Sequence, residues 1–342
     1  MNGPAAKAGS ALARPRLGFL GVGWIGRHRM QAMLETGLVE AVAVADPSPD
    51  MAAEALKLAP GAERAAGLEA LIEAGVDGVV IATPSAQHAE QAIMALERGA
   101  AVFCQKPLGR TAAEARAVVE AAAAADRLLC VDLSYRFTEG MRRIRELVRA
   151  GELGRVFAAD LTFHNAYGPD KAWFYDPALS GGGCVMDLGV HLVDLALWTL
   201  DFPKVTRVSS SLFAGGEPLG PAPGRVEDYA VAELELAGGA IARVACSWRL
   251  QAGCDAVIAA EVYGTEGGAA MRNVGGSFYD FAAERFRGTA REPLSAPPEA
   301  WGGRAAGDWA RRLANGEGFD PEAWRLVEVA QALDRIYRRA AD

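Results

Sequence analysis

The sequence contains few of the residues from which metal and redox centres are built. It has four histidines and five cysteines in 342 residues, and no two cysteines form a C-x-x-C pair. An odd number of cysteines without paired spacing argues against a disulfide framework and against a structural zinc site. We therefore expect reduced thiols, a cytoplasmic location and no bound metal.

Long apolar stretches and an excess of positive charge are also missing. No uninterrupted apolar run approaches the roughly 18 residues of a membrane span, so no membrane association is predicted. The 35 lysines and arginines are outnumbered by 43 aspartates and glutamates, which gives a net charge of −8. Such a surface repels phosphate backbones and disfavours nucleic acid as a partner. Residues 1–14 lack the apolar core of a secretory signal, and we expect a disordered extension there.

The composition favours a folded protein with a large core. The chain is 51% hydrophobic and 23% charged, which is typical of globular domains and not of disordered chains. Because compact domains usually have about 100–150 residues, the length predicts two domains. We place them at residues 15–135 and 136–342.

The first domain is predicted to be α/β. Its short apolar runs read as strands, and they are Leu17–Gly21, Val39–Ala45, Gly78–Ala82, Ala101–Cys104 and Leu128–Asp132. Helical patterns separate them, at Ile25–Thr36, Pro49–Leu58, Ala66–Ala74, Ala86–Arg98 and Ala112–Asp126. Since parallel strands need crossover connections, this alternation predicts a parallel sheet covered by helices on both faces.

The second domain is predicted to be α+β, built on an open, mainly antiparallel sheet with helices on one face. Its expected strands are Val156–Phe163, Val205–Phe213, Tyr229–Leu236, Ala240–Leu250 and Ala256–Gly264. Its expected helices are Glu139–Arg149, Met186–Thr199, Gly307–Ala314 and Pro321–Ala340. We interpret Leu219–Gly224 and Glu292–Glu299 as proline-rich loops. The uncovered sheet face needs a partner, so we expect a homodimer or homotetramer.

A glycine-rich turn marks the first candidate site. Gly21-Val22-Gly23-Trp24-Ile25-Gly26 follows a predicted strand and opens a helix, which is the context of a dinucleotide-binding G-x-G-x-x-G. Asp46 ends the second strand 20 residues after Gly26, where a carboxylate accepts from ribose hydroxyls and repels a 2′-phosphate. The alternative is an ordinary turn, with Asp46 capping the next helix. These residues predict a Rossmann domain and NAD as cofactor, with NADP left open.

Two further segments lie at the same predicted sheet edge. Thr83-Pro84 follows the third strand, and His88 lies in the first turn of the next helix, where a capping or packing role is the alternative. Gln105-Lys106-Pro107 follows the fourth strand, which places Lys106 near the nicotinamide end of a cofactor. There a lysine can stabilise a developing alkoxide. A solvated surface lysine is the alternative.

Polar residues also interrupt the apolar helix Met186–Thr199. Asp187, His191 and Asp194 share one helical face, directly after the glycines 181–183. A histidine beside carboxylates is a tunable proton carrier, and we expect Asp194 to hold its imidazole in one tautomer. The alternative is a buried structural network. A less favoured alternative is that Asp187 and His191 are two ligands of a metal ion.

Other candidates depend on position alone. Arg136 lies at the domain junction, where it could contact the nicotinamide or form a hinge. His164, Asn165 and Trp173 belong to a polar and aromatic stretch suited to binding a sugar.

With these motifs in this order, the chain resembles the glucose–fructose oxidoreductase / inositol dehydrogenase / rhizopine-catabolism (Gfo/Idh/MocA) family from Arg16 to Arg339. The resemblance implies an NAD(P)-dependent oxidoreductase of sugars, polyols or related compounds, with an oligomer-forming second domain. Lys106 is implied to be catalytic, His191 to accept the proton, and Asp187 to assist. The implied cofactor-binding residues are Gly21, Gly23, Gly26, Asp46, Thr83, Pro84, His88, Gln105 and Lys106. By their position we also expect Trp24, Ile25 and Arg136 to contact the cofactor.

The sequence departs from the family at one position, since Gln105 stands where the family has glutamate before the lysine. Glutamine still binds a ribose hydroxyl, but it removes a negative charge beside Lys106. The leading hypothesis is a dehydrogenase that oxidises a secondary alcohol of a cyclic sugar or polyol. Its alternatives are a dinucleotide-sensing regulator without activity and an NAD-assisted glycosidase on the same fold.

Overall fold

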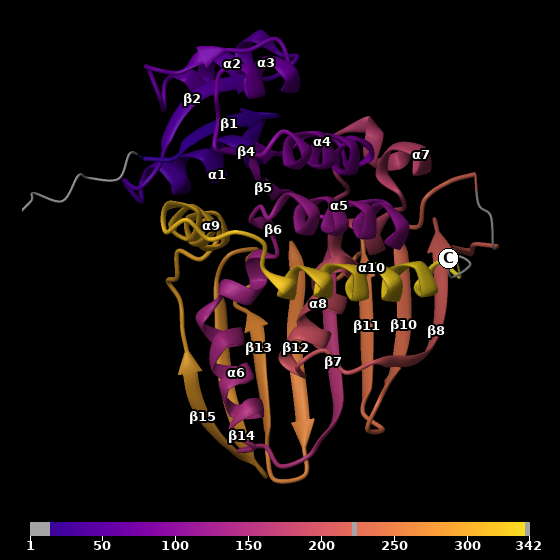
Figure 1. The fold of residues 1–342 in the computed structure, drawn as a ribbon. Helices are drawn as coiled ribbons and strands as arrows, with labels where there is room; N and C mark the ends of the chain where they lie inside the picture. Colours follow the sequence, from indigo (N-terminus) through magenta and orange to yellow (C-terminus); the bar gives the residue numbers. More distant parts are fainter. Residues whose placement is uncertain (1–13, 221–223, 339–342) are drawn as a thin grey trace, which may run out of the picture.

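The computed structural model describes residues 14–220 and 224–338, and it contains two sheets (Figure 1). The expected extension at residues 1–14 lies outside the described residues except for Arg14. The last two residues of the predicted helix Pro321–Ala340 lie outside them as well. The structure confirms the α/β class of the first part and the mainly antiparallel sheet of the second.

The first domain is a parallel sheet in the order β3-β2-β1-β4-β5-β6. Its strands are β1 (Arg16–Leu20), β2 (Glu40–Ala45), β3 (Glu63–Arg64), β4 (Gly78–Ile81), β5 (Ala101–Cys104) and β6 (Leu129–Val131). Its helices are α1 (Trp24–Leu34), α2 (Pro49–Leu56), α3 (Leu68–Glu73), α4 (Ser85–Glu97) and α5 (Ala112–Ala125). Only the two-residue β3 was absent from the sequence prediction.

The carboxyl ends of β1, β4 and β5 lie at one edge of this sheet. Backbone hydrogen bonds fix them there, from Ala82 to Leu20 at 2.8 Å and from Gln105 to Ile81 at 2.8 Å. All four residues of β4 and of β5 are buried, because helices cover both faces of a parallel sheet. The segments that follow these strands are therefore presented side by side on a rigid support.

The second domain is a nine-stranded sheet in the order β15-β14-β13-β12-β7-β11-β10-β8-β9. Its strands are β7 (Val156–Asn165), β8 (Val205–Ala214), β9 (Glu217–Pro218), β10 (Tyr229–Leu236), β11 (Ile241–Ser247), β12 (Ala256–Gly264), β13 (Gly268–Asn273), β14 (Phe281–Arg287) and β15 (Ala290–Ser295). Neighbouring strands are antiparallel except β7 and β11, which pair in parallel.

The proposed loop at Glu292–Glu299 is partly wrong, because its first residues belong to β15. Proline usually excludes a central strand, since it cannot donate to the ladder. Here Pro293 pairs with Glu284 on the last strand of the sheet. An edge strand tolerates this missing donor, and the sequence pattern alone did not reveal that the strand lies at an edge.

Helices cover one face of the second sheet. They are α6 (Glu139–Arg149), α8 (Val190–Thr199) and α10 (Trp324–Ile336), which lie in front of the strands in Figure 1. The short elements of this domain are η1 (Ser134–Phe137), η2 (Ala172–Tyr175), α7 (Pro177–Ser180), the π-helical turn η3 (Val185–Gly189) and η4 (Pro321–Ala323). On the opposite face Val231 and Ile241 are each 37% exposed. Self-association through that face stays a prediction.

The C-terminal helices return to the first domain. Helix α9 (Arg304–Ala314) lies beside α1 (Figure 1), and its Trp309 is fully buried in a core shared with Leu17 and Phe19 of β1. Helix α10 contacts both α5 of the first domain and α8 of the second. Residues assigned from the sequence to the second domain thus complete the core of the first.

Replacing Trp309 tests whether α9 is part of the first domain's core. We expect Trp309→Ala to lower the free energy of unfolding by about 3–5 kcal/mol, since it empties a fully buried site. Trp309→Phe is the matched control and should cost less than half as much. It keeps most of the volume and removes an indole N–H that has no partner among the described residues. Urea unfolding would measure both, and a loss below about 1 kcal/mol for alanine would contradict this packing.

Candidate functional site

A cavity of about 1650 Å³ lies where the two domains meet. Its walls include the glycine-rich turn, the segments after β4 and β5, and the start of the helical segment that follows residues 181–183. The candidate residues that line it are Gly21, Gly23, Trp24, Ile25, Asp46, Thr83, Pro84, His88, Gln105, Lys106, Trp173, Asp187 and His191. Most of the sequence candidates therefore meet in one place.

The glycine-rich turn is shaped for close approach of a ligand. Gly21 has φ +79°, and a Cβ there would lie 2.6 Å from the Ala82 carbonyl oxygen. A Cβ on Gly26 would lie 2.1 Å from the Gly21 oxygen, whereas one on Gly23 would meet only open space. Helix α1 begins directly afterwards, with no side-chain cap and no acidic residue in its first turn. Its free N-terminal amides suit a pyrophosphate, so the turn fits a dinucleotide.

Asp46 holds the glycine-rich turn. Its carboxylate accepts from the backbone N–H of Val22 at 2.8 Å and from that of Ser48 at 2.8 Å. The alternative role of capping the next helix falls to Ser48, whose hydroxyl accepts from the Met51 N–H. The glycine-rich turn therefore holds Asp46 at the cavity wall, where a dinucleotide bound to that turn would contact it.

His88 joins the two loops that follow β4 and β5. Its ring nitrogens lie 2.7 Å from the Thr83 carbonyl oxygen and 2.6 Å from the Pro107 carbonyl oxygen. The side chain is 1% exposed, and burial lowers its pKa. These contacts favour the packing role that the sequence left open, with His88 holding the loop on which Lys106 lies.

Lys106 and Asp187 form an ion pair between the domains. The Lys106 Nζ donates to Asp187 Oδ1 at 2.6 Å and to the Asp187 backbone oxygen at 2.8 Å. The other carboxylate oxygen accepts from Trp248 Nε1 at 3.0 Å. Both charged side chains are less than 20% exposed, so the ammonium group is held in one position at the cavity wall.

His191 lies one turn after Asp187, at the start of α8, and is 7% exposed. Its ring meets that of Tyr135 edge-on, with centroids 4.9 Å apart. Burial, together with the positive charges of Lys106 and Arg29, lowers the pKa of His191 well below its usual value. The imidazole is therefore neutral at neutral pH and able to accept a proton.

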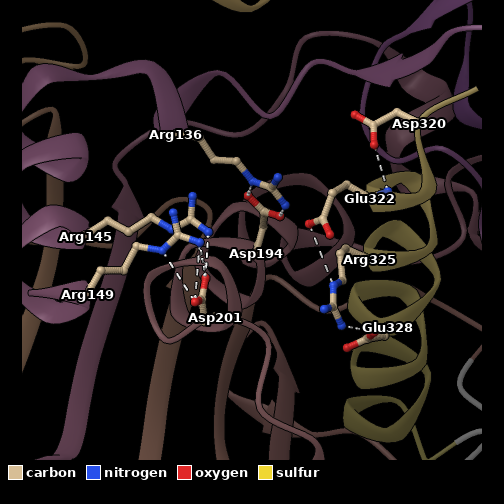
Figure 2. Close-up of polar contacts among 9 residues, drawn as sticks. All are labelled: Arg136, Arg145, Arg149, Asp194, Asp201, Asp320, Glu322, Arg325 and Glu328. Atoms are coloured by element: carbon tan, nitrogen blue, oxygen red, sulfur yellow. Dashed lines mark hydrogen bonds and ion pairs between the residues drawn. The ribbon is translucent and has the colours of Figure 1, made fainter. Parts of the chain in front are cut away.

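Asp194 does not contact His191, and the prediction that it orients the imidazole is wrong. Arg136 donates through Nε to Asp194 Oδ2 at 2.7 Å and through a second nitrogen to Oδ1. Figure 2 shows Arg136 and Asp194 pointing toward each other, beside a separate contact in which Arg145 donates to Asp201 at 2.8 Å. A buried carboxylate needs a partner, and here a guanidinium supplies it.

Arg136 itself is not among the residues that line the cavity. Its guanidinium lies 5.9 Å from the ring centre of Trp198 and 5.4 Å from that of Phe202. These contacts favour a structural role for Arg136 over the cofactor contact that the sequence had also left open.

The sequence analysis missed Asp132 and Arg29. Asp132 follows β6 and accepts from Arg29 Nε at 2.5 Å and from Gln105 Nε2 at 2.6 Å. All three residues line the cavity. The sequence offered one signal for each residue: Asp132 follows a parallel strand, and Arg29 lies on the helix after the glycine-rich turn. Neither residue belongs to a recognisable motif.

Glu227 was also missed, and it shapes the loop at residues 181–183. Its buried carboxylate accepts from the backbone N–H groups of Gly183 and Val185, each at 2.9 Å, and from the Tyr337 hydroxyl at 2.7 Å. A Cβ on Gly183 would lie 1.8 Å from the Glu227 backbone oxygen. Glycine is required there by this contact, independently of any ligand.

Of the three residues predicted from the sugar-binding stretch, only Trp173 reaches the cavity. It lies in η2 and stacks on Phe174, with ring centres 3.8 Å apart. His164 lies on β7, where it contacts the Ser247 hydroxyl at 2.8 Å and stacks on Tyr229. Asn165 accepts from the Tyr167 backbone N–H. Neither His164 nor Asn165 lines the cavity.

The described ranges, residues 14–220 and 224–338, hold neither a metal-binding cluster nor a membrane-spanning helix. No cluster of three or more His, Cys, Asp or Glu side chains there is arranged to hold a metal ion. Within the same ranges no helix has both the length and the apolar surface that crossing a membrane requires. The cysteines are free thiols, and burial raises the pKa of Cys184 well above its usual value.

Several known proteins are similar to this chain in sequence. "Rhizopine catabolism protein MocA" of Rhizobium meliloti is 36% identical over 215 residues, which is 60% of this chain and 66% of that protein. The matches to this and to two other relatives span between 58% and 66% of those proteins. Inositol 2-dehydrogenase 4 of Saccharopolyspora erythraea is 30% identical over 324 residues, covering 93% of this chain and 86% of that protein.

The match extends to a solved structure and to family models. GenD2 from gentamicin A biosynthesis, solved in complex with NAD, has a TM-score of 0.80 at 27% identity and covers 99% of this chain and 98% of that one. Residues 16–133 match an oxidoreductase family with an NAD-binding Rossmann fold, and residues 141–270 match a GFO/IDH/MocA C-terminal domain. The chain therefore belongs to the Gfo/Idh/MocA oxidoreductase family.

Proposed function

We propose that the protein is an NAD-dependent dehydrogenase acting on a secondary alcohol of a cyclic sugar, polyol or related compound. The observation that carries this proposal is the fixed ammonium group of Lys106, held by Asp187 in the cavity that a neutral His191 also lines. A cationic donor and a proton acceptor in one cavity are what oxidation of an alcohol requires.

Each residue has a distinct part in this reaction. The Lys106 Nζ donates a hydrogen bond to the hydroxyl oxygen and stabilises its growing negative charge, while Asp187 fixes the ammonium group. His191 accepts the hydroxyl proton, because its lowered pKa leaves it unprotonated at neutral pH. The bound nicotinamide supplies the hydride acceptor. The alcohol carbon loses a hydride and its oxygen a proton, so the product is a ketone.

Ring-shaped substrates are favoured by the second-domain wall of the cavity. Trp173 and Phe174 stack there, and the side chains of Tyr135 and Trp301, whose ring centres are 4.9 Å apart, also line it. Aromatic faces suit the apolar faces of sugar rings. The inositol dehydrogenase relative supports the same substrate class.

The cofactor should be NAD in preference to NADP. Asp46 would face a 2′-phosphate, and the following Pro47-Ser48-Pro49 supplies no cation to neutralise it. The nearest candidate cation is Arg27, and its Nη1 donates to the Val22 carbonyl oxygen at 3.1 Å. We expect NAD to bind at least about tenfold more tightly than NADP by calorimetric titration. Asp46→Ala should reduce the ratio of NAD affinity to NADP affinity, even if it weakens the binding of both cofactors. A preference of the unaltered protein for NADP would contradict the assignment.

Substitution of His191 tests the catalytic assignment. His191→Ala should lower turnover by a factor on the order of a hundred or more while NAD affinity stays nearly unchanged. Lys106→Ala should also reduce turnover strongly. His164→Gln is the matched control, since this histidine lies on β7 outside the cavity, and its turnover should equal that of the unaltered protein. Full turnover in a folded, NAD-binding His191→Ala protein would end the assignment.

The pH profile tests the protonation state of His191. Protonated imidazole cannot accept a proton, so kcat/KM should fall on the acid side. Because the pKa of His191 is lowered by burial and by Lys106, that fall should begin below the ordinary histidine value of about 6.5. Lys106→Met removes one of the nearby positive charges and should move the acid limb to higher pH. An acid limb above pH 6.5, or one that Lys106→Met leaves in place, would contradict this role.

A further inference from the structure

Asp132 is a buried carboxylate at the cavity that the proposed reaction does not use. It follows β6, is 2% exposed, and its backbone N–H donates to the Cys104 oxygen at 2.9 Å. Oδ2 accepts from both Arg29 Nε and Gln105 Nε2, whereas Oδ1 has no hydrogen-bond partner in the described part of the chain. Its position is fixed by backbone and side chain together.

This carboxylate determines how the Gln105 amide is oriented. An ionised carboxylate only accepts hydrogen bonds, so the Gln105 NH₂ group must face Asp132. The Gln105 side-chain carbonyl oxygen then points away from Asp132, and none of the described residues donates a hydrogen bond to it. Gln105 lines the cavity next to Lys106. Residue 105 can thus present a hydrogen-bond acceptor to a ligand without carrying a charge.

The charges around Asp132 make the residue types at 105 and 132 depend on each other. Arg29 is 6% exposed and is the cation that balances Asp132. The Arg29 Nη1 contacts His28 Nδ1 at 2.7 Å, and burial and Arg29 lower the pKa of His28. A glutamate at position 105 would place a second carboxylate against the first, with one guanidinium to balance both. One carboxylate and one amide is the combination that fits.

The location of Gln105 indicates which end of a dinucleotide it would face. Asp46 follows β2 and Gln105 follows β5, and the strand order separates these strands by three spacings. Three spacings of about 4.8 Å put the two residues roughly 14 Å apart along the sheet edge. Asp46 lies at the adenosine end by its contact with the glycine-rich turn, so Gln105 lies toward the nicotinamide end.

We propose that Asp132 is a positioning residue for the dinucleotide, which turns the Gln105 carbonyl oxygen toward a ribose hydroxyl on the nicotinamide side. This rests on the dinucleotide binding in the proposed function, but not on any substrate. Asp132 acts through Gln105, and Arg29 pairs with the Asp132 carboxylate and holds it in place.

The test is a set of three variants titrated with NAD and with ADP, which fills only the adenosine side. Asp132→Leu removes the oxygen that accepts from both Arg29 and Gln105, so the Gln105 amide is no longer held in one orientation. Asp132→Leu should weaken NAD binding about tenfold or more and leave ADP binding unchanged. Gln105→Glu places a second carboxylate against Asp132 and should also weaken NAD binding while leaving ADP binding unchanged.

The double variant Gln105→Glu with Asp132→Asn should recover most of the NAD affinity. The double variant again has one carboxylate and one amide beside Arg29, and the carboxylate now at position 105 presents an acceptor to the cavity. If Asp132→Leu does not fold, the comparison of Gln105→Glu with the double variant decides the question. Absence of recovery in a folded double variant, or equal losses of NAD and ADP affinity in any of the three, would overturn the proposal.

Asp194→Leu is the matched control for loss of a buried aspartate–arginine pair. Asp194 is 1% exposed and pairs with Arg136 outside the cavity lining. It should lower the melting temperature while leaving the ratio of NAD to ADP affinities unchanged, and a changed ratio would count against a specific role of Asp132. These titrations contain no substrate. A protein that binds NAD as expected but oxidises no sugar would contradict the proposed function and leave this inference standing.

Discussion

The ion pair between Lys106 and Asp187 is the constraint on which the site depends. Lys106 is fixed at the carboxyl end of β5 in the first domain, and Asp187 lies in the π-helical turn that leads into α8 of the second. Removing one partner of such a shielded pair leaves an uncompensated charge, which costs several kcal/mol. The pair therefore holds the edge of one sheet against the start of one helix, and the cavity lies where they meet.

The other buried charges at the domain junction follow the same rule. Arg29 of α1 is paired with Asp132 after β6, and Arg136 of η1 with Asp194 of α8. Each pair joins two separate elements, so these cations are compensated within the protein. His191 lies among them as a neutral group. A site in which the fixed charges are paired and one histidine is free to titrate is suited to proton transfer.

The sequence predicted the sheets from strand periodicity and placed Lys106 at the shared edge of the parallel strands. That Asp187 and His191 belong to the same site was expected from the polar face of their helix and from the family resemblance. The sequence did not predict the partner of Asp194. Helical spacing tells which residues share a face, but Arg136 comes from a distant segment and captures that carboxylate. Asp132 belongs to no motif, and its role is visible only when β5 and β6 lie side by side.

Reduction of NAD across a panel of cyclic polyols, pyranoses and glycosides tests the central claim most directly. The account predicts that at least one compound yields NADH and a ketone in equal amounts. Conversion of a glycoside without net NADH would contradict it and favour the NAD-assisted glycosidase. No conversion of any panel member by a protein shown to bind NAD would contradict it as well, and would favour a dinucleotide sensor.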